Sequence, residues 1–124
     1  MNLNVEKILI IGLGMIGSSI ALASKSKGIK VYGFDKSNNS IKEALEKNII
    51  DSKVESILDI NSKDFVKKVD LIIVAVPPKQ TLDVLNDLKN IWNTDVTITD
   101  TSSVKNHIKS VSYTHLRAHE TVRN

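Results

Sequence analysis

The chain alternates short apolar runs with segments in which apolar residues recur every three or four positions. The apolar runs over residues 7–11 and 71–76 predict central strands that are buried on both faces. The β-branched and aromatic residues of 29–34 predict a further strand, and the apolar–polar alternation over 95–99 predicts one nearer the sheet edge. Residues 49–60 give a weaker signal, which indicates at most a short strand inside a loop.

Three main helices are predicted between these strands. The first covers residues 15–27 and is followed by Gly28, because glycine is a common C-cap residue. The second begins at a capping box formed by Ser40 and Glu43. The third covers residues 77–92 and opens with two prolines, which a first helical turn tolerates. The side chains expected to face the core from these helices are Ile16, Ile20, Ala23, Ile41, Ala44, Leu45, Leu82, Leu85, Leu88 and Ile91.

Two brief helices complete the pattern, one capped by Asn61 or Ser62 and one capped by Ser103. Strands that alternate with helices predict an α/β fold, a doubly wound parallel sheet of about five strands with helices on both faces. No internal repeat and no interdomain linker interrupts the sequence. We therefore expect one domain over residues 1–110, with the sheet incomplete.

Composition excludes several classes of function. The chain has 124 residues and a formal net charge of only +3, with its lysines scattered, so no basic block predicts nucleic-acid binding. It has no cysteine, which excludes disulfides, thiolate metal sites and cysteine nucleophiles and agrees with a cytoplasmic location. No apolar run approaches the roughly 18 residues of a membrane helix. The apolar stretch 8–23 has some features of a signal peptide, but Glu6 and three glycines oppose that interpretation.

The last fourteen residues differ in composition from the rest of the chain. Residues 1–110 contain fifteen lysines and no arginine, whereas residues 111–124 contain two arginines, two of the three histidines and no lysine. The segment also resembles the translation of a transposon-end adapter used in sequencing libraries. We therefore interpret 111–124 as a non-native tail and expect the natural protein to continue past about Ser110. The alternative is a short natural basic tail.

Gly12, Gly14 and Gly17 form a G-x-G-x-x-G motif between a predicted strand and a predicted helix. In that context Gly12 permits a tight turn, Gly14 leaves room for a pyrophosphate, and Gly17 lets the helix pack on the strand. The helix start offers free N–H groups and the positive end of the helix dipole to the anion. An ordinary glycine turn is the alternative. The motif indicates a dinucleotide-binding Rossmann domain.

Asp35 closes the second predicted strand, eighteen residues after Gly17. An acidic residue near this offset accepts hydrogen bonds from the adenosine ribose hydroxyls and repels a 2′-phosphate, which favours NAD over NADP. Lys36 beside it would relieve part of that repulsion. The alternative is that Asp35 only caps the following turn.

Two further segments leave strands at the same edge of the sheet. Val76 and Pro77 end the fourth strand, where ligands of open α/β sheets bind. Residues 100–105 concentrate an acid, three hydroxyls and an amine where substrate and nicotinamide would meet. Ser103 in this segment is also a helix cap candidate, and His107 is expected to be solvated rather than catalytic. The expected cofactor-binding residues are Gly12, Leu13, Gly14, Met15, Ile16, Gly17, Asp35, Lys36, Val76 and Pro77, and no metal site is expected.

The segments GLGMIGSSIALA, GFD, LIIVAVPP and ITDTSSVK together resemble the N-terminal domain of the prephenate dehydrogenase family, including its arogenate-using members. The resemblance covers residues 5 to about 109, and the ending T-D-x-x-S-V-K is its most specific part. It implies NAD-dependent oxidative decarboxylation of prephenate to 4-hydroxyphenylpyruvate in tyrosine biosynthesis. Ser18 and Ser102 depart from the glycines frequent at those positions.

The resemblance also implies an active-site role for Ser103, near a catalytic histidine of a later His-Pro motif that this sequence does not contain. It implies a helical C-terminal domain, also absent here, that makes the full-length protein a homodimer and completes the pocket for prephenate or arogenate. The fragment by itself is expected to be inactive. The alternatives are another NAD(P)-dependent dehydrogenase of the 6-phosphogluconate dehydrogenase-like superfamily and a non-enzymatic NAD-binding regulatory module.

Overall fold

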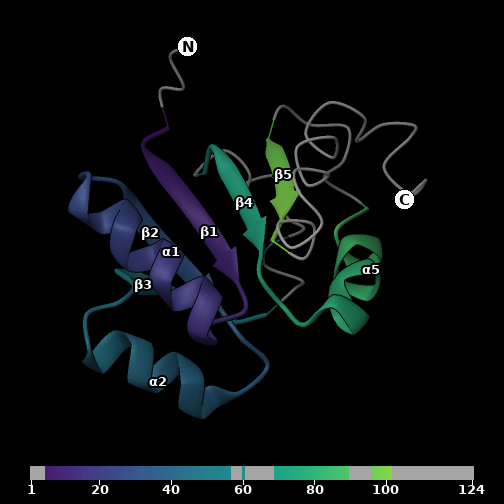
Figure 1. Ribbon diagram of the computed structural model, residues 1–124, viewed down its shortest axis with the longest axis horizontal. Coiled ribbons are helices and arrows are strands. Elements are labelled where there is room, and N and C mark those ends of the chain that lie inside the picture. Colours follow the sequence, from purple (N-terminus) through teal and green to yellow (C-terminus); the bar gives the residue numbers. More distant parts are fainter. Residues whose placement is uncertain (1–4, 57–59, 61–68, 90–95, 102–124) are drawn as a thin grey trace.

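The computed structural model describes residues 5–56, 60, 69–89 and 96–101. Within these residues, five parallel strands form one sheet in the order β3-β2-β1-β4-β5 (Figure 1). The strands are β1 (Lys7–Ile11), β2 (Lys30–Phe34), β3 (Ser52–Lys53), β4 (Leu71–Val74) and β5 (Thr97–Asp100). The helices are α1 (Met15–Ser26), α2 (Asn38–Glu46) and α5 (Pro78–Asp87). The predicted parallel α/β sheet is confirmed, and β5 lies at its edge as expected.

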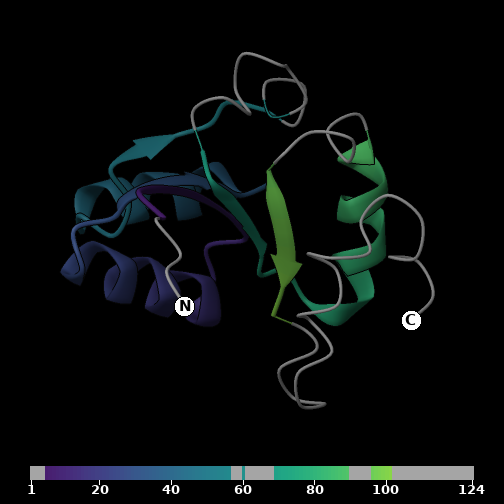
Figure 2. The same ribbon diagram turned by 90° about the horizontal axis from the view of Figure 1, so that it is seen from above.

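The central strand β1 contributes buried side chains to both faces of the sheet. Ile8 and Ile10 are buried in one cluster with residues of α1 and α2, whereas Leu9 and Ile11 are buried in a second cluster with residues of α5. The two helical layers lie on opposite sides of the sheet (Figures 1 and 2). This alternation follows from the two-residue period of a strand, which sends successive side chains to opposite faces. The fold is therefore doubly wound.

The three central strands end at one level. Ile11 of β1 pairs with Phe34 of β2 and with Val74 of β4. Because the strands are parallel, their carboxyl ends meet at one edge, and the turns that follow them are brought together there. No helix within the described part of the chain is long and apolar enough to cross a bilayer.

Of the three residues of α1 predicted to face the core, Ile20 packs against it, but Ile16 and Ala23 do not. The buried residues of α1 are Gly17 and Ala21, whereas Ile16 is 49% exposed and Ala23 is exposed. A Cβ on Gly17 would collide with the carbonyl oxygen of Gly12, so this face must carry the smallest residues. Close backbone approach, rather than side-chain hydrophobicity, sets the rotation of the helix. The prediction for the end of α1 is confirmed, since Gly28 has φ +84° and donates to Lys25 O at 2.9 Å.

Helix α2 begins earlier than predicted, and the Ser40–Glu43 capping box was wrong. Ser37 is the N-cap, and its hydroxyl accepts a hydrogen bond from the Ser40 N–H at 3.2 Å. Ser40 therefore lies inside the first turn. Ile41 and Ala44 are buried as predicted. Leu45, predicted to be in the core, is exposed.

Helix α5 also differs in its buried face. Val84, Leu85 and Leu88 are buried, but Leu82 is 52% exposed. Thr81 is buried with them, and its hydroxyl donates to the Pro77 carbonyl one turn earlier at 3.4 Å. A threonine that bonds to its own helix can face the core, which a pattern of leucines alone does not reveal. The predicted brief helices after residues 61 and 103, and Ile91, lie outside the described residues.

Candidate dinucleotide-binding site

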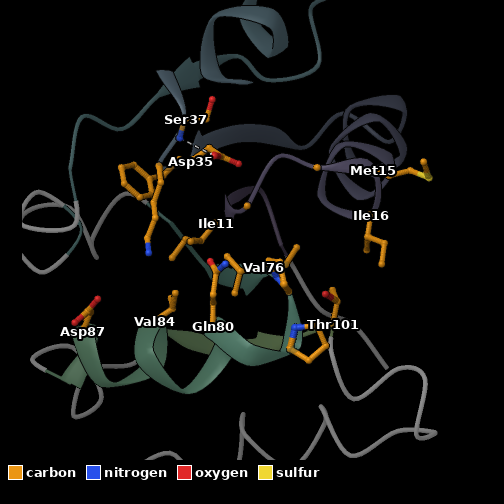
Figure 3. Close-up of a pocket in the computed structure, with 17 residues that line it drawn as sticks. Ile11, Met15, Ile16, Asp35, Ser37, Val76, Gln80, Val84, Asp87 and Thr101 are labelled. Atoms are coloured by element: carbon orange, nitrogen blue, oxygen red, sulfur yellow. Dashed lines mark hydrogen bonds between the residues drawn. The ribbon is translucent and has the colours of Figure 1, made fainter. Parts of the chain in front are cut away.

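A pocket of about 610 Å³ lies at the carboxyl edge of the sheet. The start of α1 and the end of β2 lie on one side of it, and α5 lies on the other (Figure 3). The lining residues are Ile11, Gly12, Gly14, Met15, Ile16, Phe34, Asp35, Lys36, Ser37, Ala75, Val76, Pro77, Pro78, Gln80, Val84, Asp87 and Thr101. All the sequence-predicted cofactor residues line this pocket except Leu13 and Gly17. Ser103 lies outside the described residues.

Gly12 makes the turn that leaves β1. Its φ is +104°, a conformation that side chains with a Cβ rarely adopt. A Cβ there would also come within 2.6 Å of Ala75 O, in the turn that follows β4. The Gly12 N–H donates to Phe34 O at 2.8 Å, so the turn is also attached to the end of β2. Gly12 is therefore required where three strand ends meet.

Gly14 stands immediately before α1 and borders open space. A Cβ built on it would meet no atom within 4 Å, and its φ of −77° is accessible to any residue. No side chain caps α1, and no acidic residue lies in its first turn. The N–H groups of a first helical turn need acceptors from outside the helix. An uncapped helix start beside open space fits a bound diphosphate, which supplies both the acceptors and the negative charge.

Asp35 lies at the end of β2 and is attached to two turns. Its Oδ2 accepts a hydrogen bond from the Leu13 N–H at 2.7 Å, and its Oδ1 accepts one from the Ser37 N–H at 2.8 Å (Figure 3 shows the second). Asp35 therefore does cap the turn that follows β2, as the alternative interpretation of this residue expected. This capping does not exclude ribose recognition, because each carboxylate oxygen has a second lone pair.

Helix α5 contributes a pocket wall that the sequence analysis missed. Gln80, Val84 and Asp87 project from it toward β2 and the glycine turn (Figure 3). Their spacing of four and three residues is a helical stripe, and this signal was obscured by the leucines on neighbouring positions. Thr101, directly after β5, also lines the pocket, and its N–H donates to Val74 O at 3.0 Å.

The chemistry of the lining is divided. Ile11, Phe34, Val76 and Val84 give it an apolar surface, whereas the end of β2 adds a carboxylate and the amine of Lys36. An apolar surface with a few polar groups at its border is typical of sites for planar organic ligands. Within the described ranges, no cluster of three or more histidine, cysteine, aspartate or glutamate residues is arranged to hold a metal ion.

The doubly wound sheet, the glycine turn and the uncapped helix at the crossover point define a dinucleotide-binding domain of the Rossmann type. Residues 20–123 match the family described as "Prephenate dehydrogenase, nucleotide-binding domain", and the chain belongs to this family. The glycine motif lies just before the matched range. The family expected from the sequence motifs is thereby confirmed.

Curated relatives and solved structures agree with this assignment. Prephenate dehydrogenase of Bacillus subtilis is 35% identical over 111 residues, which is 87% of this chain and 29% of that protein. Prephenate dehydrogenase of Lactococcus lactis is 40% identical over 106 residues, or 83% of this chain and 28% of that protein. The crystal structure of prephenate dehydrogenase from A. aeolicus, in complex with hydroxyphenyl propionate and NAD+, superposes with a TM-score of 0.70 at 30% identity. The superposition covers 82% of this chain and 35% of the A. aeolicus chain.

The chain therefore spans less than a third of the length of these curated relatives. The expectation of an NAD-binding domain is confirmed at the level of the family, because the matching domain is a nucleotide-binding one and the A. aeolicus protein holds NAD+.

Proposed function

We propose that the pocket binds NAD and that the complete protein oxidises prephenate, or the related arogenate. The observation that carries the proposal is the uncapped start of α1 beside Gly14, within a member of the prephenate dehydrogenase family. In this assignment the N–H groups of the first turn of α1 bind the diphosphate. The apolar side chains of Ile11, Phe34 and Val84 hold the adenine.

Asp35 accepts hydrogen bonds from the adenosine ribose in this assignment. Its negative charge disfavours a 2′-phosphate, which supports NAD over NADP, and Lys36 offsets part of that charge. When bound, the nicotinamide would supply the hydride acceptor, and prephenate would be oxidised and decarboxylated to 4-hydroxyphenylpyruvate and carbon dioxide. Met15, Ile16 and Thr101 border the pocket at the start of α1 and the end of β5, where this ring would lie (Figure 3).

Ser103 follows Thr101 by two residues and belongs to the same segment after β5. We propose that it contacts the substrate, together with a histidine supplied by sequence beyond this chain. Dimerisation through a further helical domain, a cytoplasmic location and a role in tyrosine biosynthesis are parts of the same proposal. They rest on the membership of the chain in the prephenate dehydrogenase family.

Two measurements test this function. Titration of the chain with NAD+ and NADP+ in a calorimeter should show saturable binding that is tighter for NAD+. The protein expressed from the complete gene should then reduce NAD+ when given prephenate, with carbon dioxide released in equal amount. Saturable NAD+ binding without turnover of prephenate or arogenate would favour a regulatory module instead. Turnover of an unrelated hydroxy acid would favour another dehydrogenase.

A further inference from the structure

The Asp35 carboxylate connects two turns that are far apart in sequence. Leu13 lies inside the glycine turn between Gly12 and Gly14, and its N–H donates to Asp35 Oδ2 at 2.7 Å. Ser37 is the N-cap of α2, and its N–H donates to Asp35 Oδ1 at 2.8 Å. We call this pair of hydrogen bonds the Asp35 bridge. It joins the glycine turn to the start of the second helix.

Leu13 depends on side chains for its backbone hydrogen bonds. Leu13 lies after the end of β1 and before the start of α1, so neither the sheet nor the helix supplies its hydrogen-bond partners. Its N–H is held by Asp35, and its carbonyl oxygen accepts a hydrogen bond from the Ser18 hydroxyl at 3.1 Å. The Leu13 side chain is itself buried between the sheet and the helices. A charged acceptor is stronger than a neutral one, so the bond to the carboxylate is the stronger of the two that hold the Leu13 backbone.

We propose that Asp35 is a positioning residue for the diphosphate site, separate from any contact that it makes with the ribose. This inference rests on the proposed NAD binding. The Asp35 bridge holds the peptide unit between Gly12 and Leu13. The next peptide unit, whose carbonyl oxygen accepts from the Ser18 hydroxyl, leads directly into Gly14 and the uncapped start of α1. Loss of the carboxylate would release that segment. The N–H groups that face the diphosphate would then have to be ordered at the moment of binding, which weakens affinity.

This arrangement couples cofactor choice to loop geometry. A carboxylate with both oxygens bonded to backbone N–H groups cannot rotate away from a 2′-phosphate without breaking at least one of the two bonds. Replacing Asp35 with a small neutral residue removes the repulsion and the bridge together. We therefore expect Asp35→Ala to lose affinity for NAD+ without becoming a good binder of NADP+.

The probe that separates the two roles is an NAD+ analogue whose adenosine ribose lacks the 2′ and 3′ hydroxyls. Asp35→Ala should weaken binding of this analogue by about tenfold, the equivalent of one charge-assisted hydrogen bond. If Asp35 acts on the ribose hydroxyls alone, the variant and the wild-type chain will bind the analogue equally well, and the proposal is overturned. Asp35→Asn, which keeps the shape and one acceptor oxygen, should bind the analogue with an affinity between those of the wild-type chain and Asp35→Ala.

A second readout needs no ligand. The amide hydrogen of Leu13 should exchange with solvent about tenfold faster in Asp35→Ala than in the wild-type chain. Unchanged exchange at Leu13 would also overturn the proposal. If the wild-type chain binds no NAD+ at all, the proposed function fails, and this measurement still decides whether Asp35 positions the turn.

Asp51 provides the matched control. It too is a carboxylate that accepts a backbone N–H, from Val31 at 2.8 Å, but it lies beside the beginning of β2, away from the strand ends that form the pocket. Asp51→Ala should lower stability and leave both the analogue affinity and the Leu13 exchange rate unchanged. Equal losses of analogue affinity in the two variants would mean that general destabilisation explains the effect, against the proposal.

Discussion

The carbonyl oxygen of Ala75 occupies the space that a side chain on Gly12 would need, because a Cβ there would lie 2.6 Å from it. The turn after β1 and the turn after β4 are thus packed backbone against backbone. The proposed diphosphate site depends on this contact, since the same turn leads from Gly12 to the start of α1. The geometry of the site can be tested by adding single side chains to it.

Gly12→Ala should destabilise the fold and abolish NAD+ binding. The strained φ of +104° and the overlap with Ala75 should together cost roughly 2–4 kcal/mol in free energy of unfolding. Chemical denaturation measures this loss. Gly28→Ala is the control, because Gly28 also has a positive φ, +84°, but borders open space. It should cost only about 1–2 kcal/mol and leave NAD+ affinity unchanged. A similar loss of affinity in the control would contradict the assignment of the site.

Gly14→Val should separate binding from stability. The new side chain enters open space from an unstrained backbone, so the free energy of unfolding should fall by no more than about 1 kcal/mol, the cost of replacing a glycine at an N-cap. It would, however, fill the volume assigned to the diphosphate, and NAD+ affinity should fall by more than about tenfold, as for any steric block of a charged ligand group. Calorimetric titration measures the affinity. Undiminished NAD+ binding in this variant would place the diphosphate elsewhere.

The two faces of α5 should respond differently to truncation. Leu88 is fully buried, so Leu88→Ala should lower the free energy of unfolding by about 2–5 kcal/mol. Leu82 is 52% exposed, and Leu82→Ala should change it by less than about 0.5 kcal/mol. Urea denaturation of both variants compares them directly. Equal costs would show that α5 is rotated from the orientation described above.

Asp51 should make stability depend on pH in the acid range. Burial alone would raise the pKa of Asp51, but the hydrogen bond from the Val31 N–H and the nearby Lys25 ammonium outweigh it and lower the pKa below 3.8. A carboxyl whose pKa is lowered by folding stabilises the protein above its unfolded value and loses that effect as the pH falls through the folded value. Asp51→Asn should therefore reduce stability at pH 6, and its difference from the wild-type chain should shrink as the pH falls below 3.8 through the folded pKa. A series of denaturation curves from pH 6 into acid tests this, and an undiminished difference in acid would refute it.

The sequence was most informative where a pattern had one physical cause. The bounds of β1 were predicted exactly, because a continuous apolar run ended at Gly12. The helix faces were not, because the residues that pack α1 on the sheet, Gly17 and Ala21, are small and contribute little to a hydrophobic pattern. The bond between Asp35 and Leu13 could not be predicted at all. It depends on the spatial approach of two turns, which only the register of the assembled sheet determines.

The division of β1 between two cores has a consequence for how this domain tolerates change. Ile8 and Ile10 belong to one core, and Leu9 and Ile11 to the other. Inserting or deleting a single residue within β1 would turn side chains of one core toward the other. It would also shift the end of β1 by one residue relative to β2 and β4. Natural variation in length should therefore be confined to the ends of the helices farthest from the glycine turn, where an extra residue can loop out without disturbing either layer.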